Sequence, residues 1–221
     1  MFNKKPLMCA GISAILLVFL PMIFSMFGLI VWSGFFSILS NISALVLSIY
    51  FMYGFYYLGM KYKNKLLSVI SCVGIIFTIV LYVTLIFASG QITSNVEQLN
   101  QTVSQQQIVL DNLNATNASA EQIAIIQTEM SNTLFDFFGP YLVAFLVVLF
   151  LWLIGSVLFN VSLIKLKKVE YAKVTGIIGI VSIGLTLTII GIFLAIPLML
   201  AYCVMLVIIL FNQAKKFKEI R

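Results

Sequence analysis

The sequence predicts an all-α integral membrane protein with six transmembrane helices, both termini cytoplasmic, and an extracytoplasmic antiparallel helical hairpin between the third and fourth helices. Composition is the first reason. The 221 residues are 62% hydrophobic and only 9% charged, whereas a soluble domain is about half apolar and about a quarter charged. So little polar surface cannot cover a water-soluble globule, which excludes soluble enzymes and nucleic-acid-binding proteins. The second reason is where the charges lie.

The charged residues separate into basic and acidic stretches. Every Lys and Arg lies near the N-terminus, in 61–65, in 164–173 or near the C-terminus, together with two acids. The other five acids lie in 90–138, which therefore carries formal charge −5. Because Lys and Arg stay on the cytoplasmic side, the basic stretches are expected inside and 90–138 outside, in a multi-pass protein of the plasma membrane.

The apolar runs set the number of spans, since about 20 apolar residues cross a bilayer. The last run, 174–211, is too long for one crossing, and a single crossing would place the basic C-terminus outside. Two crossings place the C-terminus on the cytoplasmic side. The turn between them would then lie outside, with Gly191 and Pro197 on either side of it. The first run lacks a small-residue cleavage site, so it is predicted as an uncleaved span. The six predicted spans are about 7–31, 35–59, 66–89, 140–163, 174–192 and 195–211.

The predicted spans contain no Lys, Arg, Asp, Glu or His. Proton relays and voltage sensors need ionisable groups in the membrane, and hydrolytic triads need a base. We therefore predict a protein that is not an enzyme and has no catalytic, cofactor or metal site. Three parts are expected: spans 1–3 in 1–89, the hairpin in 90–138, and spans 4–6 with a basic tail in 139–221.

Small polar residues and glycines mark two further features of the spans. Four small polar residues in the spans have two interpretations. They would line a polar cavity, or they would form hydrogen bonds within and between helices, and the second interpretation is favoured. The four are Ser37, Asn41, Ser182 and Thr186. Small residues at 4-3-4 spacing share one face if the helix persists, and they predict a helix-packing seam. That seam comprises Gly184, Thr188, Gly191 and Ala195.

The acidic stretch carries two heptad-like stripes that flank the turn-like sequence NATNAS, 114–119. They predict helices over about 91–113 and 120–137 that pair as a short antiparallel coiled coil. Such a hairpin would be either a solvated spacer or an arm that docks a partner. Three acceptor sequons for N-glycosylation start at Asn100, Asn114 and Asn117. The stripes are Ile92, Val96, Leu99, Val103, Gln106, Leu110 and Leu113, and Ile123, Ile126, Met130, Thr133 and Phe137.

A family resemblance rests on AGISAILLVFLPMIF at 10–24, the KYKNK turn, and the Gly-, Leu- and Ile-rich segment 175–211. The chain resembles a family of uncharacterised archaeal and bacterial integral membrane proteins that is known only as a domain of unknown function. The long connection at 90–138 departs from that family, where a shorter one is expected. The resemblance implies a polytopic membrane protein and no activity, so it transfers no site residue.

Two classes of function follow. The leading one is a non-enzymatic membrane protein that anchors or organises a complex, with the lipid bilayer around it and a protein partner at 91–137. It would act as an oligomer or as a subunit of a membrane complex. The alternative is a transporter or channel for a neutral or apolar solute or a lipid, because spans without charges do not forbid such a path.

Overall fold

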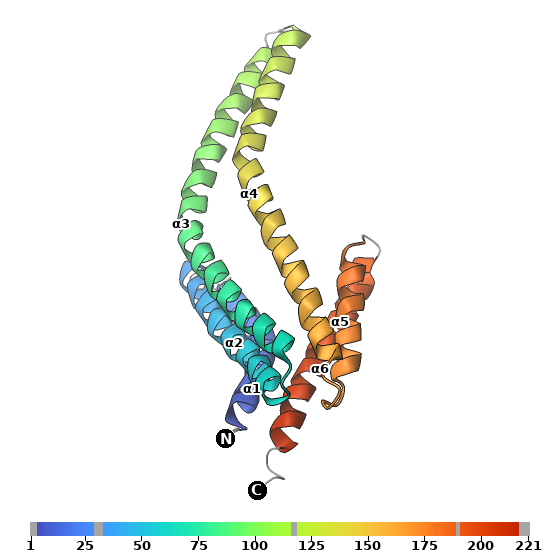
Figure 1. Ribbon diagram of the computed structural model, residues 1–221. Helices are drawn as coiled ribbons and strands as arrows, with labels where there is room; N and C mark the ends of the chain where they lie inside the picture. Colours follow the sequence, from blue (N-terminus) through green and yellow to red (C-terminus); the bar gives the residue numbers. More distant parts are fainter. Residues whose placement is uncertain (1–3, 29–32, 116–118, 189–190, 217–221) are drawn as a thin grey trace. The chain divides into compact units, whose positions relative to one another are not determined.

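The computed structural model describes residues 4–28, 33–115, 119–188 and 191–216, and the regular secondary structure in these ranges is α-helical throughout (Figure 1). Four stretches in it are long and apolar enough to cross a membrane, which confirms a helical, membrane-type chain. Two further apolar stretches, Lys5–Leu20 and Ala172–Thr186, are shorter among the described residues. The helices are α1 (Lys5–Gly28), α2 (Ser33–Lys61), α3 (Lys65–Ala115), α4 (Ala120–Ile164), α5 (Ala172–Thr186) and α6 (Gly191–Lys216).

Helices α3 and α4 are longer than the sequence predicts. They contain 51 and 45 residues, about twice the roughly 20 that cross a bilayer. Each joins an apolar part to a polar part without an interruption at Gly90 or at Gly139. Pro140 lies inside α4 and does not end it, although its missing N–H leaves the carbonyl of Asp136 without its usual helical donor.

The predicted turn between Gly191 and Pro197 is wrong. Helix α5 ends at Thr186, α6 already begins at Gly191, and Pro197 lies inside α6. The Thr188 hydroxyl accepts a hydrogen bond from the backbone N–H of Gly191, the first residue of α6, at 3.1 Å. This bond gives a partner to one of the N–H groups that the start of a helix leaves without one.

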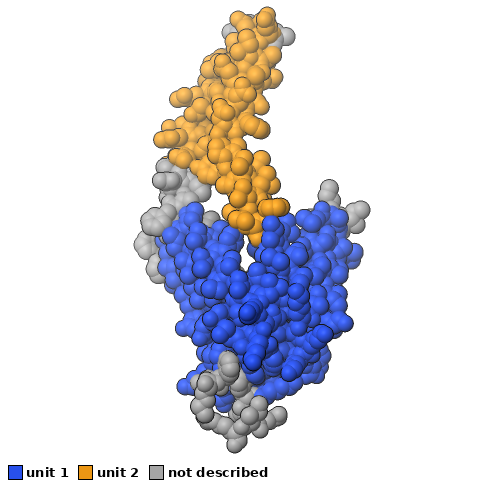
Figure 2. Space-filling model, viewed as in Figure 1, with its two compact units in different colours: residues 1–84, 152–221 blue, residues 85–151 orange. Residues whose placement is uncertain are grey.

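The chain divides into two compact units (Figure 2). Unit 1 contains residues 1–84 and 152–221, so it combines the first and last parts of the sequence. Unit 2 contains residues 85–151, which include the whole acidic stretch and the part of α4 from Pro140 to Leu151. In unit 1, α1 packs against α2 and α6, and α5 packs against α6.

The core of unit 1 lies near the basic stretches. Helix packing there is close: an added Cβ on Gly54 of α2 would lie 2.3 Å from the Cβ of Ala10 in α1. Two aromatic rings, those of Phe55 and Phe159, meet edge to face with centroids 5.0 Å apart. Elsewhere large apolar side chains such as Ile76 are exposed, as is expected of helices that face lipid. Among the fully buried side chains are Leu7, Phe55, Leu58, Leu67, Leu163, Ile209 and Leu210.

Candidate functional site

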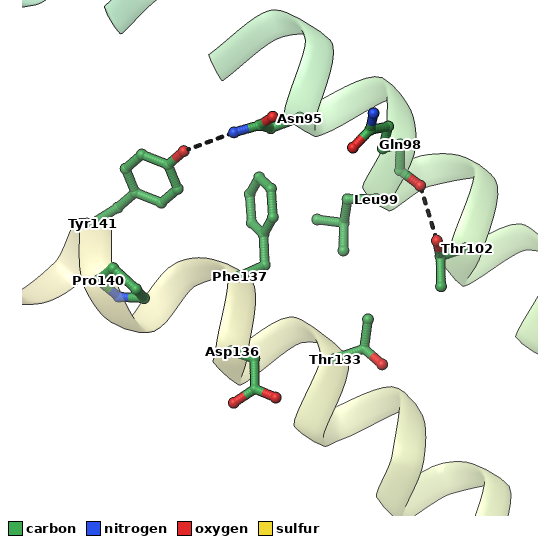
Figure 3. Close-up of a pocket in the computed structure, with 9 residues that line it drawn as sticks. All are labelled: Asn95, Gln98, Leu99, Thr102, Thr133, Asp136, Phe137, Pro140 and Tyr141. Carbon is green, nitrogen blue, oxygen red and sulfur yellow. Dashed lines mark hydrogen bonds between the residues drawn. The ribbon is translucent and has the colours of Figure 1, made fainter. Parts of the chain in front are cut away.

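Unit 2 carries an open groove of about 470 Å³ between the acidic stretch of α3 and that of α4 (Figure 3). Amide and hydroxyl groups predominate on the α3 side, whereas α4 contributes a carboxylate and aromatic rings. The Asn95 amide donates a hydrogen bond to the Tyr141 hydroxyl at 3.3 Å, and the Phe137 ring lies 5.6 Å from the Tyr141 ring. The lining is Asn95, Gln98, Leu99, Thr102, Thr133, Asp136, Phe137, Pro140 and Tyr141.

Most residues of the two heptad-like stripes predicted from the sequence are partly buried in unit 2. Ile92 falls among the residues whose side chains are not described, and Val96 is exposed, but every other stripe residue is partly buried. Two polar stripe positions meet, because the Gln106 amide donates to the Thr133 hydroxyl at 3.4 Å. The Oε1 of Gln106 is buried without a hydrogen-bond partner in the described part of the chain. Polar stripe positions therefore weaken the pairing of α3 and α4.

Large apolar side chains are also exposed within the acidic stretch of unit 2, outside the groove. Ile108 is 60% exposed, Ile125 is 50% exposed and Phe135 is 74% exposed. In the apolar helices such exposure suits lipid, but the acidic stretch is polar enough to lie in water. Burying one such side chain against a partner would contribute roughly 1.5–3 kcal/mol.

The three sequons belong to unit 2. Asn100 is exposed on α3, where it is held in regular helix. The side chain of Asn114 and all of Asn117 lie outside the described residues. Glycosylation at these three asparagines stays a prediction.

Two of the four residues expected to line a polar cavity have hydrogen-bond partners within their own helix. The Ser182 hydroxyl donates to the carbonyl of Ile178 at 2.8 Å, and the Thr186 hydroxyl donates to that of Ile183 at 2.7 Å. Asn41 is half-buried in α2, and the side chain of Ser37 lies outside the described residues. The two hydroxyls therefore satisfy their hydrogen-bonding capacity within α5.

The four predicted seam residues do not lie on one continuous helix. Gly184 is exposed in α5 with nothing within 4 Å of an added Cβ, and Thr188 is exposed in the turn. Gly191 and Ala195 are buried in α6. The expected common face required an unbroken helix, and the turn after Thr186 removes it.

Closer packing occurs one to two turns earlier in α5, against Asn160 of α4. An added Cβ on Gly176 would lie 2.6 Å from the Asn160 carbonyl oxygen, and one on Gly179 would lie 2.1 Å from its Oδ1. Asn160 itself is 2% exposed, and its amide donates to the Ser156 carbonyl at 2.9 Å. Sequence reasoning missed this contact, although the three-residue spacing of Gly176 and Gly179 could have indicated it.

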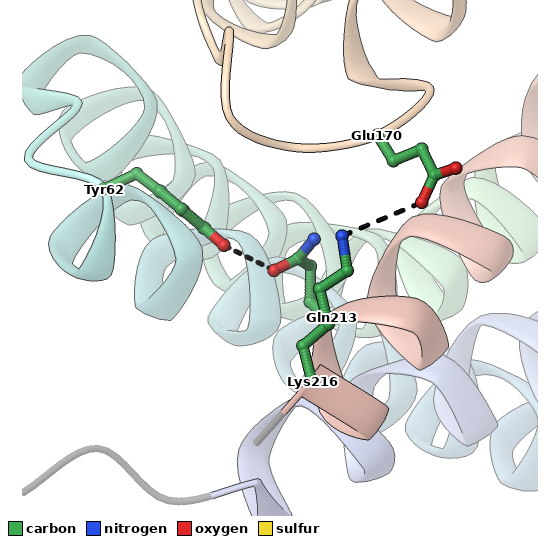
Figure 4. Close-up of polar contacts among 4 residues, drawn as sticks. All are labelled: Tyr62, Glu170, Gln213 and Lys216. Carbon is green, nitrogen blue, oxygen red and sulfur yellow. Dashed lines mark hydrogen bonds and ion pairs between the residues drawn. The ribbon is translucent and has the colours of Figure 1, made fainter. Parts of the chain in front are cut away.

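A polar cluster lies at the basic end of unit 1 (Figure 4). The Tyr62 hydroxyl donates to Oε1 of Gln213 at 2.5 Å, and Lys216 lies 3.7 Å from the Glu170 carboxylate. Burial raises the pKa of the Tyr62 phenol above its ordinary value of 10.0, because the charged form loses water. The phenol therefore stays a donor at neutral pH.

Asn64 ties the loop between α2 and α3 to α4. Its amide donates to the Ser162 carbonyl at 2.9 Å, while its Oδ1 accepts from the N–H of Leu67 at 3.1 Å and caps α3. Neighbouring Lys63 takes a left-handed conformation, with φ of 54°, to close this short loop. Within the described ranges, no three His, Cys, Asp or Glu residues gather in a group that could hold a metal ion.

Comparisons with known proteins found no match: no family model, no curated protein and no solved structure is similar to the chain at a significant level. The resemblance drawn from the sequence therefore stays a prediction.

Proposed function

We propose that this chain is a non-enzymatic polytopic membrane protein that anchors or organises a membrane complex by docking a protein partner on residues 91–137. The observation that carries the proposal is the exposure of large apolar side chains, above all Ile108 and Ile125, in a segment too polar to enter lipid. The groove beside Tyr141 adds amide and hydroxyl groups that can hydrogen-bond a bound chain.

The proposal includes a topology. We infer six spans in the plasma membrane, cytoplasmic termini, and a helical hairpin that stands outside as a short antiparallel coiled coil. Every Lys and Arg lies at the ends of the apolar stretches that do not adjoin residues 90–138, and this distribution supports the orientation. The hydrogen bond between Gln106 and Thr133 supports pairing of the two stripes.

Cysteine labelling in intact cells tests the topology. In a background with Cys9, Cys72 and Cys203 replaced by Ser, Gln105→Cys and Lys167→Cys each add one exposed thiol. A membrane-impermeant maleimide should label the thiol at 105 in intact cells and the thiol at 167 only after permeabilisation. Equal labelling of both in intact cells would contradict the proposed orientation.

Charge substitution tests the docking surface. Ile108→Asp and Ile125→Asp each place a carboxylate on an exposed apolar position, so the variants should fold while binding fails. Gln127→Asp adds the same charge at an exposed polar position and serves as the matched control. Proteins recovered with the chain in mild detergent are quantified by mass spectrometry. A partner recovered with the control but lost from both isoleucine variants supports the proposal, and unchanged recovery in all three refutes it.

A further inference from the structure

One face of the acidic part of α4 is exposed in unit 2. Four residues at 3-4-3 spacing share this face, which lies nearly opposite the stripe that contains Thr133 and Phe137. Figure 3 shows those two side chains turned towards α3. All four residues of the exposed face are accessible, and a large apolar side chain stands at each end of it. We call it the outer face of α4, and its residues are Ile125, Thr128, Asn132 and Phe135.

Three exposed acidic residues flank the outer face. Glu121 precedes Ile125 by four positions, which is about one helical turn. Glu129 and Asp136 each follow a residue of the face by the same interval, so the three acidic positions are about 10–12 Å apart along the helix axis. Every Lys and Arg of the chain lies outside residues 85–151, so unit 2 contains no side-chain cation that pairs with these carboxylates. The outer face therefore combines exposed apolar area with negative charge.

This combination fits a helix of a partner protein that carries basic residues. In coiled coils, apolar residues at 3-4 spacing form the seam, and charged residues beside the seam select the partner by pairing with opposite charges. Thr128 can enter such a seam, because its hydroxyl already donates to the carbonyl of Ala124 at 2.8 Å. A matching helix would place apolar side chains against Ile125 and Phe135, with Lys or Arg about every second turn beside them.

A second copy of this chain fits the outer face less well. The acidic stretch carries formal charge −5, so pairing two such faces would bring like charges together, which costs free energy. The negative surface of a membrane leaflet is repelled for the same reason. A basic protein segment is the occupant that both the apolar side chains and the carboxylates attract.

We propose that the outer face of α4 binds a basic amphipathic helix of the partner protein, as a third helix beside α3 and α4. Ile125 and Phe135 supply the apolar contact, while the carboxylates that flank them pair with Lys or Arg. This binding rests on the docking function proposed above, to which it adds the chemistry of the partner segment. Ile108 lies on α3 and contributes to docking outside this contact.

Peptides of defined charge test the outer face on the full chain in phosphatidylcholine nanodiscs. Three fluorescent helical peptides of about three heptads share a Leu seam and carry Lys, Glu or Gln beside it. Fluorescence anisotropy gives their dissociation constants, with empty nanodiscs as the blank. We expect the Lys peptide to bind about tenfold or more tightly than the Glu peptide. Glu129→Lys should weaken binding of the Lys peptide about tenfold and strengthen that of the Glu peptide, because one attraction becomes a repulsion.

Glu97→Lys is the matched control, since it reverses one exposed acidic charge on α3 of the same unit. Its affinities for the three peptides should equal those of the unsubstituted chain. Equal effects of Glu97→Lys and Glu129→Lys would overturn the site in favour of general attraction to an acidic unit. Failure of the Lys peptide to bind, or equal binding of the Lys and Glu peptides, would overturn the proposal. A dimer of the unsubstituted chain that Phe135→Asp disrupts would assign the face to a second copy instead.

The partner recovered in mild detergent separates this proposal from the docking function. It should be lost from Glu129→Lys and retained by Glu97→Lys. A partner that both of these variants retain, but that Ile108→Asp and Ile125→Asp lose, would overturn the basic helix and leave the docking function intact. Unchanged recovery in the two isoleucine variants would overturn the docking function itself.

Discussion

Gly176→Ala should weaken the packing of α5 against α4. The new methyl group would lie 2.6 Å from the carbonyl oxygen of Asn160, about 0.7 Å closer than the roughly 3.3 Å that carbon and oxygen atoms normally keep. The obstacle is backbone, and the Ile164 side chain lies 2.7 Å away on the same side. The helices must therefore separate. Overpacking costs about 1–3 kcal/mol, and alanine returns about 0.5–1 kcal/mol of helix propensity. The expected net loss is about 1–2 kcal/mol.

Gly184→Ala is the matched control, because it makes the same substitution two turns later in α5. Nothing lies within 4 Å of the added methyl group there, so stability should stay the same or rise by up to about 1 kcal/mol. Unfolding by detergent titration, followed by circular dichroism, measures both variants. Equal stability of Gly176→Ala and the unsubstituted chain would refute the proposed close contact, and so would equal destabilisation by the two substitutions.

Three further variants test other contacts. Asn64→Ala removes the cap on Leu67 and the bond to Ser162, so the free energy of unfolding should fall by about 1–2 kcal/mol; no change in a detergent titration would mean that neither bond matters. Tyr62→Phe should remove one late-ionising phenol from an absorbance titration, because burial raises the pKa of Tyr62 above 10.0. Since this folded pKa is raised, the stability that the phenol contributes persists below pH 10 and is lost as pH rises further. Gln106→Leu replaces a buried, unpartnered oxygen, so hydrogen exchange in unit 2 should slow; faster exchange would contradict the pairing.

Patterns with a strong physical basis were predicted well from the sequence. The all-helical class and the membrane character follow from apolar runs whose lengths match a bilayer. The heptad stripes also identified the partly buried positions of unit 2, including Leu99 and Met130, because helical periodicity determines which side chains share a face.

Features that depend on tertiary contact were not predicted. The sequence predicts a turn that ends at Pro197, but α6 begins at Gly191 and contains the proline. The contact of Gly179 with Asn160 depends on how two helices meet, which glycine spacing alone does not determine. The burial of Gln213 beside Tyr62 joins residues 151 positions apart in the sequence, and no local pattern links them.

Site-specific photo-crosslinking in native membranes tests the docking role of residues 91–137 most directly. A photoreactive amino acid replaces Ile108, Ile125 or, as the control, the exposed Lys167. We expect a discrete crosslinked protein at positions 108 and 125 that is absent at 167 and is lost when Asp occupies the other isoleucine position. Crosslinks to lipid alone, or the same adducts at all three positions, would contradict it.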